Sequence, residues 1–364
     1  MKRIVFTGGG TGGHIYPGLA VARELQKQLS CHIIWIGNET GLDRQIVEEA
    51  GIEFFGIPTG KFRRYFSLKN VTDIFNVAGG FWAARKLLTS MKPDILFSKG
   101  GFVSVPPCTA AASLGITVFS HESDYSAGLA TKLNLPFSSR LYTAYEDTIL
   151  MVREKYRGRS QVVGNPVREV FYKGDAQLGR QFLDLAPEDR ILLVLGGSQG
   201  AQQVNELVKA SLSELVKTYV VIHQTGPHKQ IELAPTGRYK PFPYIKDELP
   251  HILAAAELVV GRSGAGTIWE SATAGKPLIL IPLAGTGTRG DQVLNARYFQ
   301  RAGAAEVLLG EEASPAKLVE RVQALAQDHN KRFAMAEASK KIASTNAAKY
   351  IAEEIVRYVT GGSL

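Results

Sequence analysis

The sequence predicts an α/β protein of two domains, each built on a parallel β-sheet that is covered by helices. The length of 364 residues exceeds what one hydrophobic core usually organises. Short apolar segments alternate with helical patterns along the chain, as in doubly wound sheets. The alternation restarts near residue 190, and each half opens with a strand that leads into a glycine-rich loop. A hydrophobic content of 45% with 21% charged residues excludes the disordered and fibrous classes.

The first half is expected to form a domain over residues 1–164. Its predicted strands are residues 3–7, 32–36, 53–57, 94–98, 117–120 and 140–143. Its predicted helices are residues 17–29, 42–50, 67–90 and 105–114. Pro17 fits the first turn of its helix, where a missing N–H removes no hydrogen bond. The turn sequence Gly164-Asn165-Pro166 indicates a linker at the end of this domain.

The second half is expected to form a domain over residues 165–345. Its predicted strands are residues 191–195, 220–224, 258–261, 277–282 and 305–308. Its predicted helices are residues 201–217, 267–274, 291–302 and 315–328. A last helix at 346–359 can pack on either half, and we expect the tail 346–364 to join the first domain. Parallel sheets bind ligands at the carboxyl ends of their strands, so two such sheets facing each other would leave a cleft.

Charge and cysteine content indicate which class of partner the protein binds and in which compartment it works. The net charge of +8 implies an anionic partner, which is a nucleic acid, a membrane surface or phosphate groups. Cys31 and Cys108 have no partner spacing, which indicates a reduced compartment without disulfides. No segment approaches the ~18 apolar residues of a membrane span, and the basic start leads straight into a glycine loop rather than a signal peptide. We expect a cytoplasmic protein that is soluble or peripheral.

The first glycine loop follows the first predicted strand directly. Gly8-Gly9-Gly10-Thr11-Gly12-Gly13-His14 matches the dinucleotide fingerprint G-x-G-x-x-G, and Glu39 could serve as its ribose-binding acid. The glycines also suit any phosphate or diphosphate, because they let a helix N-terminus approach it closely. An NAD-dependent oxidoreductase and a purely structural turn are therefore the alternatives. His14 stands where a P-loop has lysine, and its ordinary pKa near 6.5 suits a general base; a structural histidine is the alternative.

Two further glycine loops open helices in the second half. They are Gly196-Gly197-Ser198-Gln199-Gly200-Ala201 and Gly261-Arg262-Ser263-Gly264-Ala265-Gly266-Thr267. Free amides at such helix starts bind anions, and Glu270 one turn further on could hold two ribose hydroxyls. Asp291 and Gln292 could read sugar hydroxyls; plain helix capping is the alternative for all of these. No Asp-x-Asp occurs, so we expect no metal and no cofactor, with amides and a helix dipole neutralising a diphosphate.

Residues 61–99 combine basic and aromatic side chains. Eight Lys or Arg residues stand here against Asp73 and Asp94. One predicted helix face carries Leu68, Val71, Phe75, Ala78 and Trp82. Packing of this face into the core is one interpretation, and docking on an anionic membrane is the other. A nucleic-acid partner is not expected, because no recognised binding module accompanies the charge.

Taken together, the ordered motifs resemble those of the MurG family within glycosyltransferase family 28. The motifs are Gly9-Gly10-Thr11-Gly12-Gly13-His14, Gly100-Gly101-Phe102-Val103-Ser104, His121-Glu122, Gly164-Asn165-Pro166-Val167-Arg168, Gly197-Ser198-Gln199-Gly200-Ala201, Arg262-Ser263-Gly264-Ala265, Glu270, Asp291-Gln292 and Asn295-Ala296. They cover nearly the whole chain. The resemblance implies a GT-B fold, which is two Rossmann-like domains with the sugar-nucleotide donor held mainly by the second. It implies an inverting transfer of N-acetylglucosamine from UDP-N-acetylglucosamine to the C4 hydroxyl of an undecaprenyl-pyrophosphoryl-muramyl peptide, which forms lipid II.

The same resemblance assigns the site residues. Those implied to bind substrate are Thr11, Gly12 and Gly13 at the diphosphate, Arg168 and Ser198 at the diphosphate and sugar, Ile245 beside uracil, Ala265, Gly266, Thr267, Ile268, Trp269 and Glu270 at phosphate and ribose, Gln292 at the sugar, and Asp124 near the donor's acyl group. His14 is the implied base, and Glu122 is a further catalytic candidate. The implied partners are the two substrates, the anionic cytoplasmic face of the plasma membrane through residues 61–99, and other cell-wall synthesis proteins.

The chain departs from the family pattern twice. The usual His-Glu-Gln-Asn reads His121-Glu122-Ser123-Asp124, so that a carboxylate replaces an amide that could donate a hydrogen bond. The usual Tyr-x-Ser-Gly-Pro reads Phe102-Val103-Ser104-Val105-Pro106 and lacks the glycine. Both departures concern the acceptor side more than the nucleotide. A related transferase with another lipid or small-molecule acceptor, and a non-catalytic binder of sugar nucleotides, are the remaining alternatives.

Overall fold

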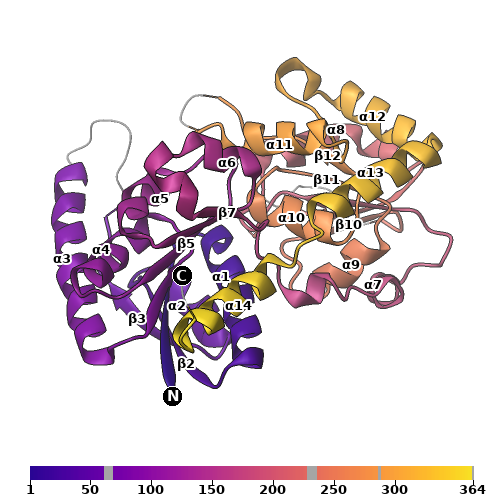
Figure 1. The fold of residues 1–364 in the computed structure, drawn as a ribbon. Coiled ribbons are helices and arrows are strands. Elements are labelled where there is room, and N and C mark those ends of the chain that lie inside the picture. Colours follow the sequence, from indigo (N-terminus) through magenta and orange to yellow (C-terminus); the bar gives the residue numbers. More distant parts are fainter. Residues whose placement is uncertain (61–68, 228–235, 286–287, 363–364) are drawn as a thin grey trace. The chain divides into compact units, whose positions relative to one another are not determined.

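The protein forms two compact units, each with one parallel β-sheet, as the alternating pattern predicts (Figure 1). The computed structural model describes residues 1–60, 69–227, 236–285 and 288–362, and the side chains of all of these except 69–74. Met1–Arg168 with Thr345–Leu364 make the first unit, and Glu169–Ser344 make the second. The predicted boundary after residue 164 falls shortly before the boundary in the structure.

The first unit contains a seven-stranded sheet of order β3-β2-β1-β4-β5-β6-β7. Its strands are β1 Lys2–Thr7, β2 Cys31–Asn38, β3 Glu53–Ile57, β4 Ile95–Ser98, β5 Val118–Glu122, β6 Arg140–Thr143 and β7 Ser160–Val162. The neighbours β2 and β4 lie on opposite sides of β1, so the strand order reverses there and the topological switch point lies between β1 and β4. The sequence did not predict β7, because this three-residue edge strand is exposed at Gln161 and Val162 and has no apolar run.

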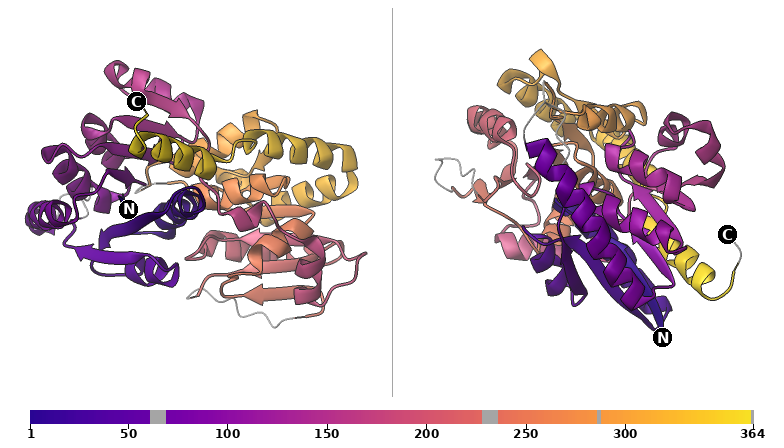
Figure 2. Two further views of the ribbon diagram at one scale, coloured as in Figure 1. Left: turned by 60° about the horizontal axis from the view of Figure 1, so that its bottom comes forward. Right: turned by 90° about the vertical axis from the view of Figure 1, so that its left-hand side faces the viewer.

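Helices cover both faces of the first sheet. They are α1 Gly12–Gln28, α2 Asp43–Glu49, α3 Lys69–Met91, α4 Val105–Ser113, α5 Leu129–Asn134, α6 Glu146–Met151 and α14 Ala347–Val359, with 3-10 turns at Phe102–Ser104, Leu135–Phe137 and Glu154–Arg159. Ile4 and Phe6 face a core made with α1, α2 and α14, whereas Val5 faces α3 and α4. Figure 2 shows α14, in yellow, beside α1. The C-terminal helix therefore completes the first unit.

Helix α1 begins earlier than the sequence predicts. Pro17 lies inside the helix rather than in its first turn. The helix starts at Gly12, directly after the glycine loop, and Thr11 is its N-cap residue. A proline inside a helix removes one hydrogen bond and crowds the carbonyl four residues before it, which here belongs to the small residue Gly13.

Helix α3 settles one alternative for the basic-aromatic segment. Ala84 and Leu88 are fully buried against the sheet. Phe75 and Trp82 are 72% and 66% exposed, so packing into the core is excluded for these two side chains. Leu68 lies outside the described residues, and the side chain of Val71 is not described. Lys99, which was included in the basic segment, is 1% exposed and does not belong to the surface.

The second unit contains a six-stranded parallel sheet of order β10-β9-β8-β11-β12-β13. Its strands are β8 Ile191–Leu195, β9 Val220–Gln224, β10 Tyr239–Phe242, β11 Leu258–Gly261, β12 Leu278–Leu280 and β13 Ala305–Val307. The sequence did not predict β10, because Pro241 is typical of a turn. Pro241 is tolerated here because β10 is an edge strand.

Helices of the second unit cover its sheet and enclose a separate core. They are α7 Ala176–Leu183, α8 Gln202–Leu215, α9 Leu249–Ala255, α10 Ala265–Thr273, α11 Asp291–Arg301, α12 Pro315–Gln327 and α13 His329–Ile342, with 3-10 turns at Glu169–Phe171 and Gly310–Glu312. Leu192 and Val194 of β8 pack against α8 and α12 in this core. The sequence did not predict α7, α9 or α13, two of which are only seven or eight residues long.

Candidate active site

In the first unit, loops that follow neighbouring strands bring most of the predicted residues to one edge of the sheet. The loops after β1, β4 and β5 carry Thr11–His14, Lys99–Gly101 and Glu122–Asp124. The segment that ends in Arg168 joins them, because His121 Nε2 donates to the carbonyl of Gly164 at 2.9 Å. The carboxyl ends of parallel strands thus gather these loops, as in other doubly wound sheets.

His14 is held by a backbone carbonyl. Its Nδ1 lies 3.3 Å from the carbonyl oxygen of Lys99. A carbonyl only accepts hydrogen bonds, so Nδ1 carries the proton and Nε2 of the neutral ring keeps its lone pair. The ring packs on the backbone of the next loop, where a Cβ at Gly101 would lie 3.0 Å from His14 Cδ2. This arrangement orients His14 with Nε2 as its basic atom.

The first glycine loop is organised by Asp43, which the sequence did not single out. The amide of Gly10 donates to both carboxylate oxygens of Asp43 at 3.0 Å, and the amide of Asn38 donates to Oδ2 at 3.3 Å. Asp43 is 3% exposed, and burial raises the pKa of its carboxyl while the two amides lower it. A Cβ at Gly9 would lie 1.9 Å from Asp43 Oδ2. Internal packing therefore accounts for Gly9, and the Gly10 amide is occupied.

The remaining part of this loop is open. Thr11 and Gly13 are exposed, and Gly12 is partly exposed. Thr11 makes no side-chain cap to the N-terminus of α1, and the first turn holds no acidic residue. Amides at such a helix start attract anions. The predicted anion contact is thus confined to the second half of the loop.

The surroundings of Glu122 are typical of a carboxylate that stabilises the fold and not of a catalytic base. Its carboxylate is 5% exposed and accepts hydrogen bonds from the amides of Asp124 and Gly128 at 3.0 and 2.9 Å. It also accepts from Thr131 Oγ1 at 2.6 Å. These bonds anchor the loop after β5 to the start of α5. A carboxylate that accepts three internal hydrogen bonds is poorly placed to take a proton from a substrate.

Asp124 and Arg168 lie at the same edge and are both partly exposed. Asp124 follows Ser123, whose hydroxyl accepts from Lys99 Nζ at 2.6 Å. The guanidinium of Arg168 stacks over the ring of Tyr16, with its carbon 4.8 Å from the ring centre. Stacking of this kind orients an arginine while its remaining donors can bind an anion.

In the second unit, three neighbouring strands bring the predicted donor residues together. Ser198 follows β8 and is exposed, Ala265–Thr267 form the first turn of α10 after β11, and Gln292 lies in the first turn of α11 after β12. Gly264 is the N-cap of α10 and supplies no side-chain cap, and no acidic residue stands in that first turn. This helix start therefore offers amides and a favourable dipole to an anion.

Hydrogen bonds fix the loops around this helix start. Ser263 Oγ donates to the carbonyl of Gln292 at 2.7 Å, and Asn295 Nδ2 donates to the carbonyl of Ser263 at 3.1 Å. The Gln292 side-chain oxygen accepts from the amide of Leu283 at 2.9 Å, which turns its amide nitrogen the other way. The motif residues Ser263 and Asn295 thus hold the α10 and α11 starts together, and Gln292 presents a donor.

Three residues of the predicted set cannot contact a ligand through their side chains. Ile268 and Trp269 are 0% and 2% exposed, and the Trp269 ring packs edge-on against Phe299. Ile245 is 2% exposed, and its amide donates to Gln224 Oε1 at 3.0 Å. The Ile268 amide is also occupied, because it donates to the carbonyl of Gly264 at 3.2 Å. Glu270, which lies between buried positions, is partly exposed.

The sequence did not predict a buried polar network that lies under the second-unit loops. His223 is fully buried in β9; its Nε2 lies 3.1 Å from Asn205 Oδ1, and its Nδ1 lies 3.2 Å from the Tyr239 hydroxyl. Asn205 in turn donates to the carbonyl of Thr225 at 3.0 Å. Burial lowers the pKa of His223 to about 4, so the ring is neutral and donates from Nε2. A histidine in an apolar strand was the only sequence signal.

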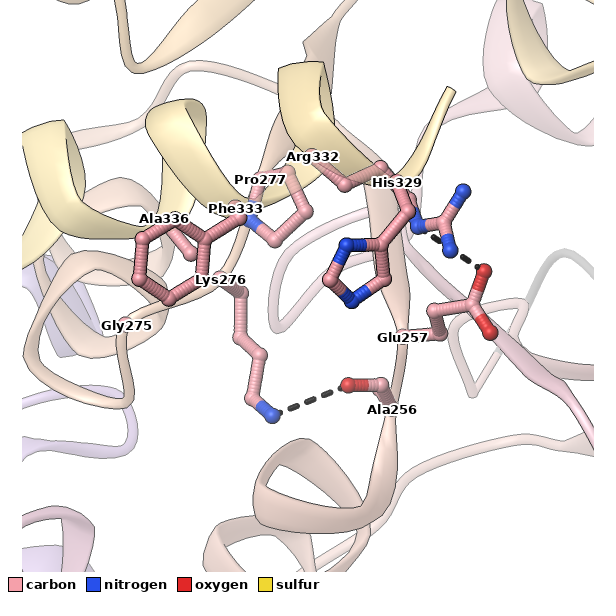
Figure 3. A pocket seen from close by; sticks show the side chains of 9 residues that line it. All are labelled: Ala256, Glu257, Gly275, Lys276, Pro277, His329, Arg332, Phe333 and Ala336. Atoms are coloured by element: carbon pink, nitrogen blue, oxygen red, sulfur yellow. Dashed lines mark hydrogen bonds and ion pairs between the residues drawn. The ribbon is translucent and has the colours of Figure 1, made fainter. Parts of the chain in front are cut away.

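A separate pocket of about 320 Å³ lies at the opposite, amino edge of the second sheet (Figure 3). Glu257 and Lys276 line it from the segments just before β11 and β12. Glu257 pairs with Arg332 at 3.1 Å, and Lys276 Nζ donates to the carbonyls of Ala254 and Ala256 at 2.7 and 2.9 Å. These charges serve the fold, and the pocket contains none of the predicted site residues.

No group of three or more His, Cys, Asp or Glu side chains among residues 1–60, 69–227, 236–285 and 288–362 could hold a metal ion. Within the same residues, every helix is too short or too polar to cross a membrane.

Comparison with protein families shows to which family the chain belongs. The N-terminal domain of glycosyltransferase family 28 matches residues 4–143, and the family's C-terminal domain matches residues 191–355. The chain belongs to glycosyltransferase family 28. The predicted α/β class and family are thereby confirmed, and the chain is a hexosyltransferase. The NAD-dependent oxidoreductase, suggested by the G-x-G-x-x-G match and Glu39, is excluded by this result.

Individual relatives agree with the family assignment. A protein of Treponema denticola is 44% identical over 385 residues, covering 99% of this chain and 98% of its own. A protein of Shouchella clausii is 42% identical over 360 residues, covering 99% of this chain and 100% of its own. Both are named UDP-N-acetylglucosamine–N-acetylmuramyl-(pentapeptide) pyrophosphoryl-undecaprenol N-acetylglucosamine transferase. The crystal structure of Acinetobacter baumannii MurG has the same fold, with a TM-score of 0.77 and 24% identity over 98% of this chain and 100% of that one.

Proposed function

We infer that this family 28 enzyme transfers N-acetylglucosamine from UDP-N-acetylglucosamine to a lipid-linked N-acetylmuramyl peptide, which forms lipid II for peptidoglycan. The observation that carries this inference is the identity of 42–44% with relatives of that name over almost the full length of both chains. The acceptor oxygen O4 bonds to the anomeric carbon, the bond from that carbon to the diphosphate breaks, and UDP leaves. Attack from the opposite face inverts the anomeric centre.

Each chemical requirement has a candidate group in the chain. His14 Nε2 accepts the proton of the acceptor hydroxyl, which its tautomer supports. The amides at the start of α10 stabilise the charge of the departing diphosphate, with Ser198 and Arg168 as further donors. Glu270 accepts hydrogen bonds from the ribose hydroxyls, and Gln292 donates to the sugar. Without any Asp-x-Asp, we propose that donor binding needs no metal ion or other cofactor.

The reaction is tested by measuring UDP release with and without a lipid-linked muramyl-peptide acceptor. We expect release to depend on the acceptor and to use UDP-N-acetylglucosamine in preference to UDP-glucose and UDP-N-acetylgalactosamine. Release that is no faster with acceptor contradicts the proposal. Tight UDP binding without turnover would indicate a non-catalytic binder, and turnover only with a diacylglycerol or a soluble acceptor would indicate the related transferase.

The lipid-linked acceptor requires a membrane, and we propose that the enzyme docks peripherally on the anionic cytoplasmic face. The exposed Phe75 and Trp82 on α3, with the exposed Lys86 on the same helix, support this. Replacing both aromatic residues by serine should weaken binding to vesicles that contain phosphatidylglycerol, measured by co-sedimentation. Leu178→Ser, another exposed apolar side chain, is the matched control. Equal binding of the double variant and the wild type contradicts docking through α3. Other cell-wall synthesis proteins are proposed as partners at the same membrane.

A further inference from the structure

Lys99 occupies the centre of the first-unit edge, although the mechanism above gives it no role. It follows β4 directly and is 1% exposed. Its amide donates to the carbonyl of Thr7 at 2.8 Å, and its own carbonyl holds His14 Nδ1 at 3.3 Å. The main chain of this residue therefore sets both the loop after β4 and the orientation of the proposed base.

The side chain of Lys99 links two further segments. Its Nζ donates to Ser123 Oγ at 2.6 Å, and the Ser123 hydroxyl donates onward to Asn165 Oδ1. Ser123 and Asn165 are 5% and 2% exposed. The chain of donors thus runs in one direction, from the lysine through the loop after β5 to the segment that ends in Arg168. Buried hydrogen-bond chains of this kind fix the groups that they join.

The charge of Lys99 is balanced by acids on that same loop. Burial lowers the pKa of its ammonium to about 8, against the opposing effect of the Glu122 and Asp124 carboxylates. Glu122 is committed to its three internal hydrogen bonds, whereas Asp124 is partly exposed at the site. A buried charge is tolerated when it is paired, and removing one partner leaves the other uncompensated. Without Lys99, two carboxylates two residues apart would repel each other in one loop.

We propose that Lys99 is a positioning residue for the transfer reaction. Its buried ammonium neutralises the Glu122–Asp124 pair and, through Ser123 and Asn165, locks the loop after β5 in the arrangement that presents Asp124 to substrate. This role rests on the proposed function, since it concerns the same site. Lys99 acts through Asp124 and contacts no reacting atom itself.

The test is a double-substitution cycle with Lys99→Met, Asp124→Asn and the combined variant. Lys99→Met keeps the length of the side chain but removes its charge and donors, and we expect kcat to fall about 10- to 100-fold through misplacement of the loop. The KM for UDP-N-acetylglucosamine should change less than about threefold. Adding Asp124→Asn removes one of the two carboxylates that repel each other and should recover at least about fivefold of the lost kcat. Effects that simply multiply, or a kcat within twofold of wild type in Lys99→Met, overturn the proposal.

Lys276 provides the matched control for loss of a buried lysine. Burial also lowers its pKa to about 8, and its Nζ donates to two backbone carbonyls away from the site. Lys276→Met should lower the melting temperature but leave kcat of the folded fraction within twofold, and Asp124→Asn should have the same effect there as in wild type. Rescue of Lys276→Met by Asp124→Asn overturns the specific pairing.

Two further measurements test the role of Lys99 if Lys99→Met does not fold or if the wild type is inactive. If Lys99→Met does not fold, Ser123→Ala breaks the same link with the charges intact; a kcat reduced at least about threefold supports the proposal, and an unchanged kcat overturns it. If the wild type shows no acceptor-dependent UDP release, the proposed function has failed. The melting temperatures of the four cycle proteins without substrate then decide the pairing, with non-additive shifts expected and additive shifts contradicting it.

Discussion

The first six strands of the larger sheet have the same order as the six strands of the other, but the two sheets carry different chemistry at their carboxyl edges. The edge of the first unit holds buried ionisable groups, namely Asp43, Lys99, His121 and Glu122. The edge of the second unit combines neutral groups, namely His223, Asn205 and Ser263, with one buried cation, Arg262, which donates to Gln203 Oε1 and to the carbonyl of Ile281 at 2.9 and 3.1 Å. The described residues of this unit include no buried carboxylate. Buried carboxylates that are held by partners fix the position of catalytic groups, whereas open amides beside neutral groups and a cation bind an anion without a competing carboxylate. From this difference we propose that proton transfer takes place at the first edge and nucleotide binding at the second.

The largest expected effect tests the chemical role of the first edge. His14→Ala should lower kcat by about 10²- to 10⁴-fold, the usual range for removing a general base, with little change in donor KM. Steady-state kinetics with lipid-linked acceptor measures both constants. His32→Ala is the control, because His32 is a partly exposed histidine of the same unit that pairs with Glu53 at 3.0 Å. A kcat within threefold of wild type in His14→Ala would remove the histidine from the mechanism.

The next effect tests the neutral histidine network beneath the second edge. The folded-state pKa of His223 is lowered to about 4, against about 6.5 when unfolded. Between these values the unfolded state binds the extra proton, so stability is lost as the pH falls from 6.5 to 4, by up to about 3 kcal/mol for this group. Urea unfolding at a series of pH values, followed by a probe in the second unit, measures the slope.

His223→Gln isolates that contribution. In the variant, the slope of the unfolding free energy of the second unit against pH should fall by the equivalent of up to one bound proton between pH 4 and 6.5. The slope for the first unit, which holds the buried His121, should stay unchanged. An identical slope in variant and wild type would mean that His223 is already charged in the folded protein, and that its hydrogen-bond network with Asn205 and Tyr239 is not neutral.

A moderate effect is expected at the nucleotide. Glu270→Ala should raise the KM for UDP-N-acetylglucosamine about tenfold and leave kcat nearly unchanged, since hydrogen bonds from ribose to a carboxylate contribute about 1.5–3 kcal/mol. Glu214→Ala, at a solvent-exposed pair with Lys217, controls for loss of a surface carboxylate of the same unit. A fall in kcat with unchanged KM in Glu270→Ala would move chemistry to the second edge and break the division of roles.

The smallest effect separates close ligand approach from packing. A Cβ at Gly266 meets no atom within 4 Å, so Gly266→Ala should leave the melting temperature unchanged. If a diphosphate sits on the start of α10, the added methyl group should raise donor KM several-fold. Gly9→Ala is the contrasting variant, because its Cβ would clash with Asp43 and lower stability instead. A donor KM equal to wild type in Gly266→Ala would place the diphosphate elsewhere.

Glycine spacing and apolar runs were enough to predict both sheets, since strands such as Ile191–Leu195 are continuous buried segments with a clear boundary. Short elements with mixed character were missed, as β10 shows with its proline. The predicted site residues do gather at two strand edges, because parallel strands end on the same side. The sequence could not show which glycines are needed for packing, since Gly9 is explained only by Asp43, a residue far along the chain.

Burial also decides which motif residues keep a side-chain role. Glu122 looked available in the sequence, but its partners Gly128 and Thr131 lie in the following loop and helix, and nothing in its own motif announces them. Likewise Lys99 was counted with a basic surface segment, although it sits at the end of a buried strand. Spacing identifies neighbours along one element, whereas contacts between elements require the fold.

Because of helix α14, the two units are completed at different times during synthesis. Ala348, Ile351 and Ile355 fill the core beside α1, so the first unit lacks part of its interior until α14 has been made. The intervening Glu169–Ser344 unit is complete before that point and can fold on the ribosome as a whole. A chain interrupted before α14 would therefore combine a complete Glu169–Ser344 unit with a first unit whose core is unfinished.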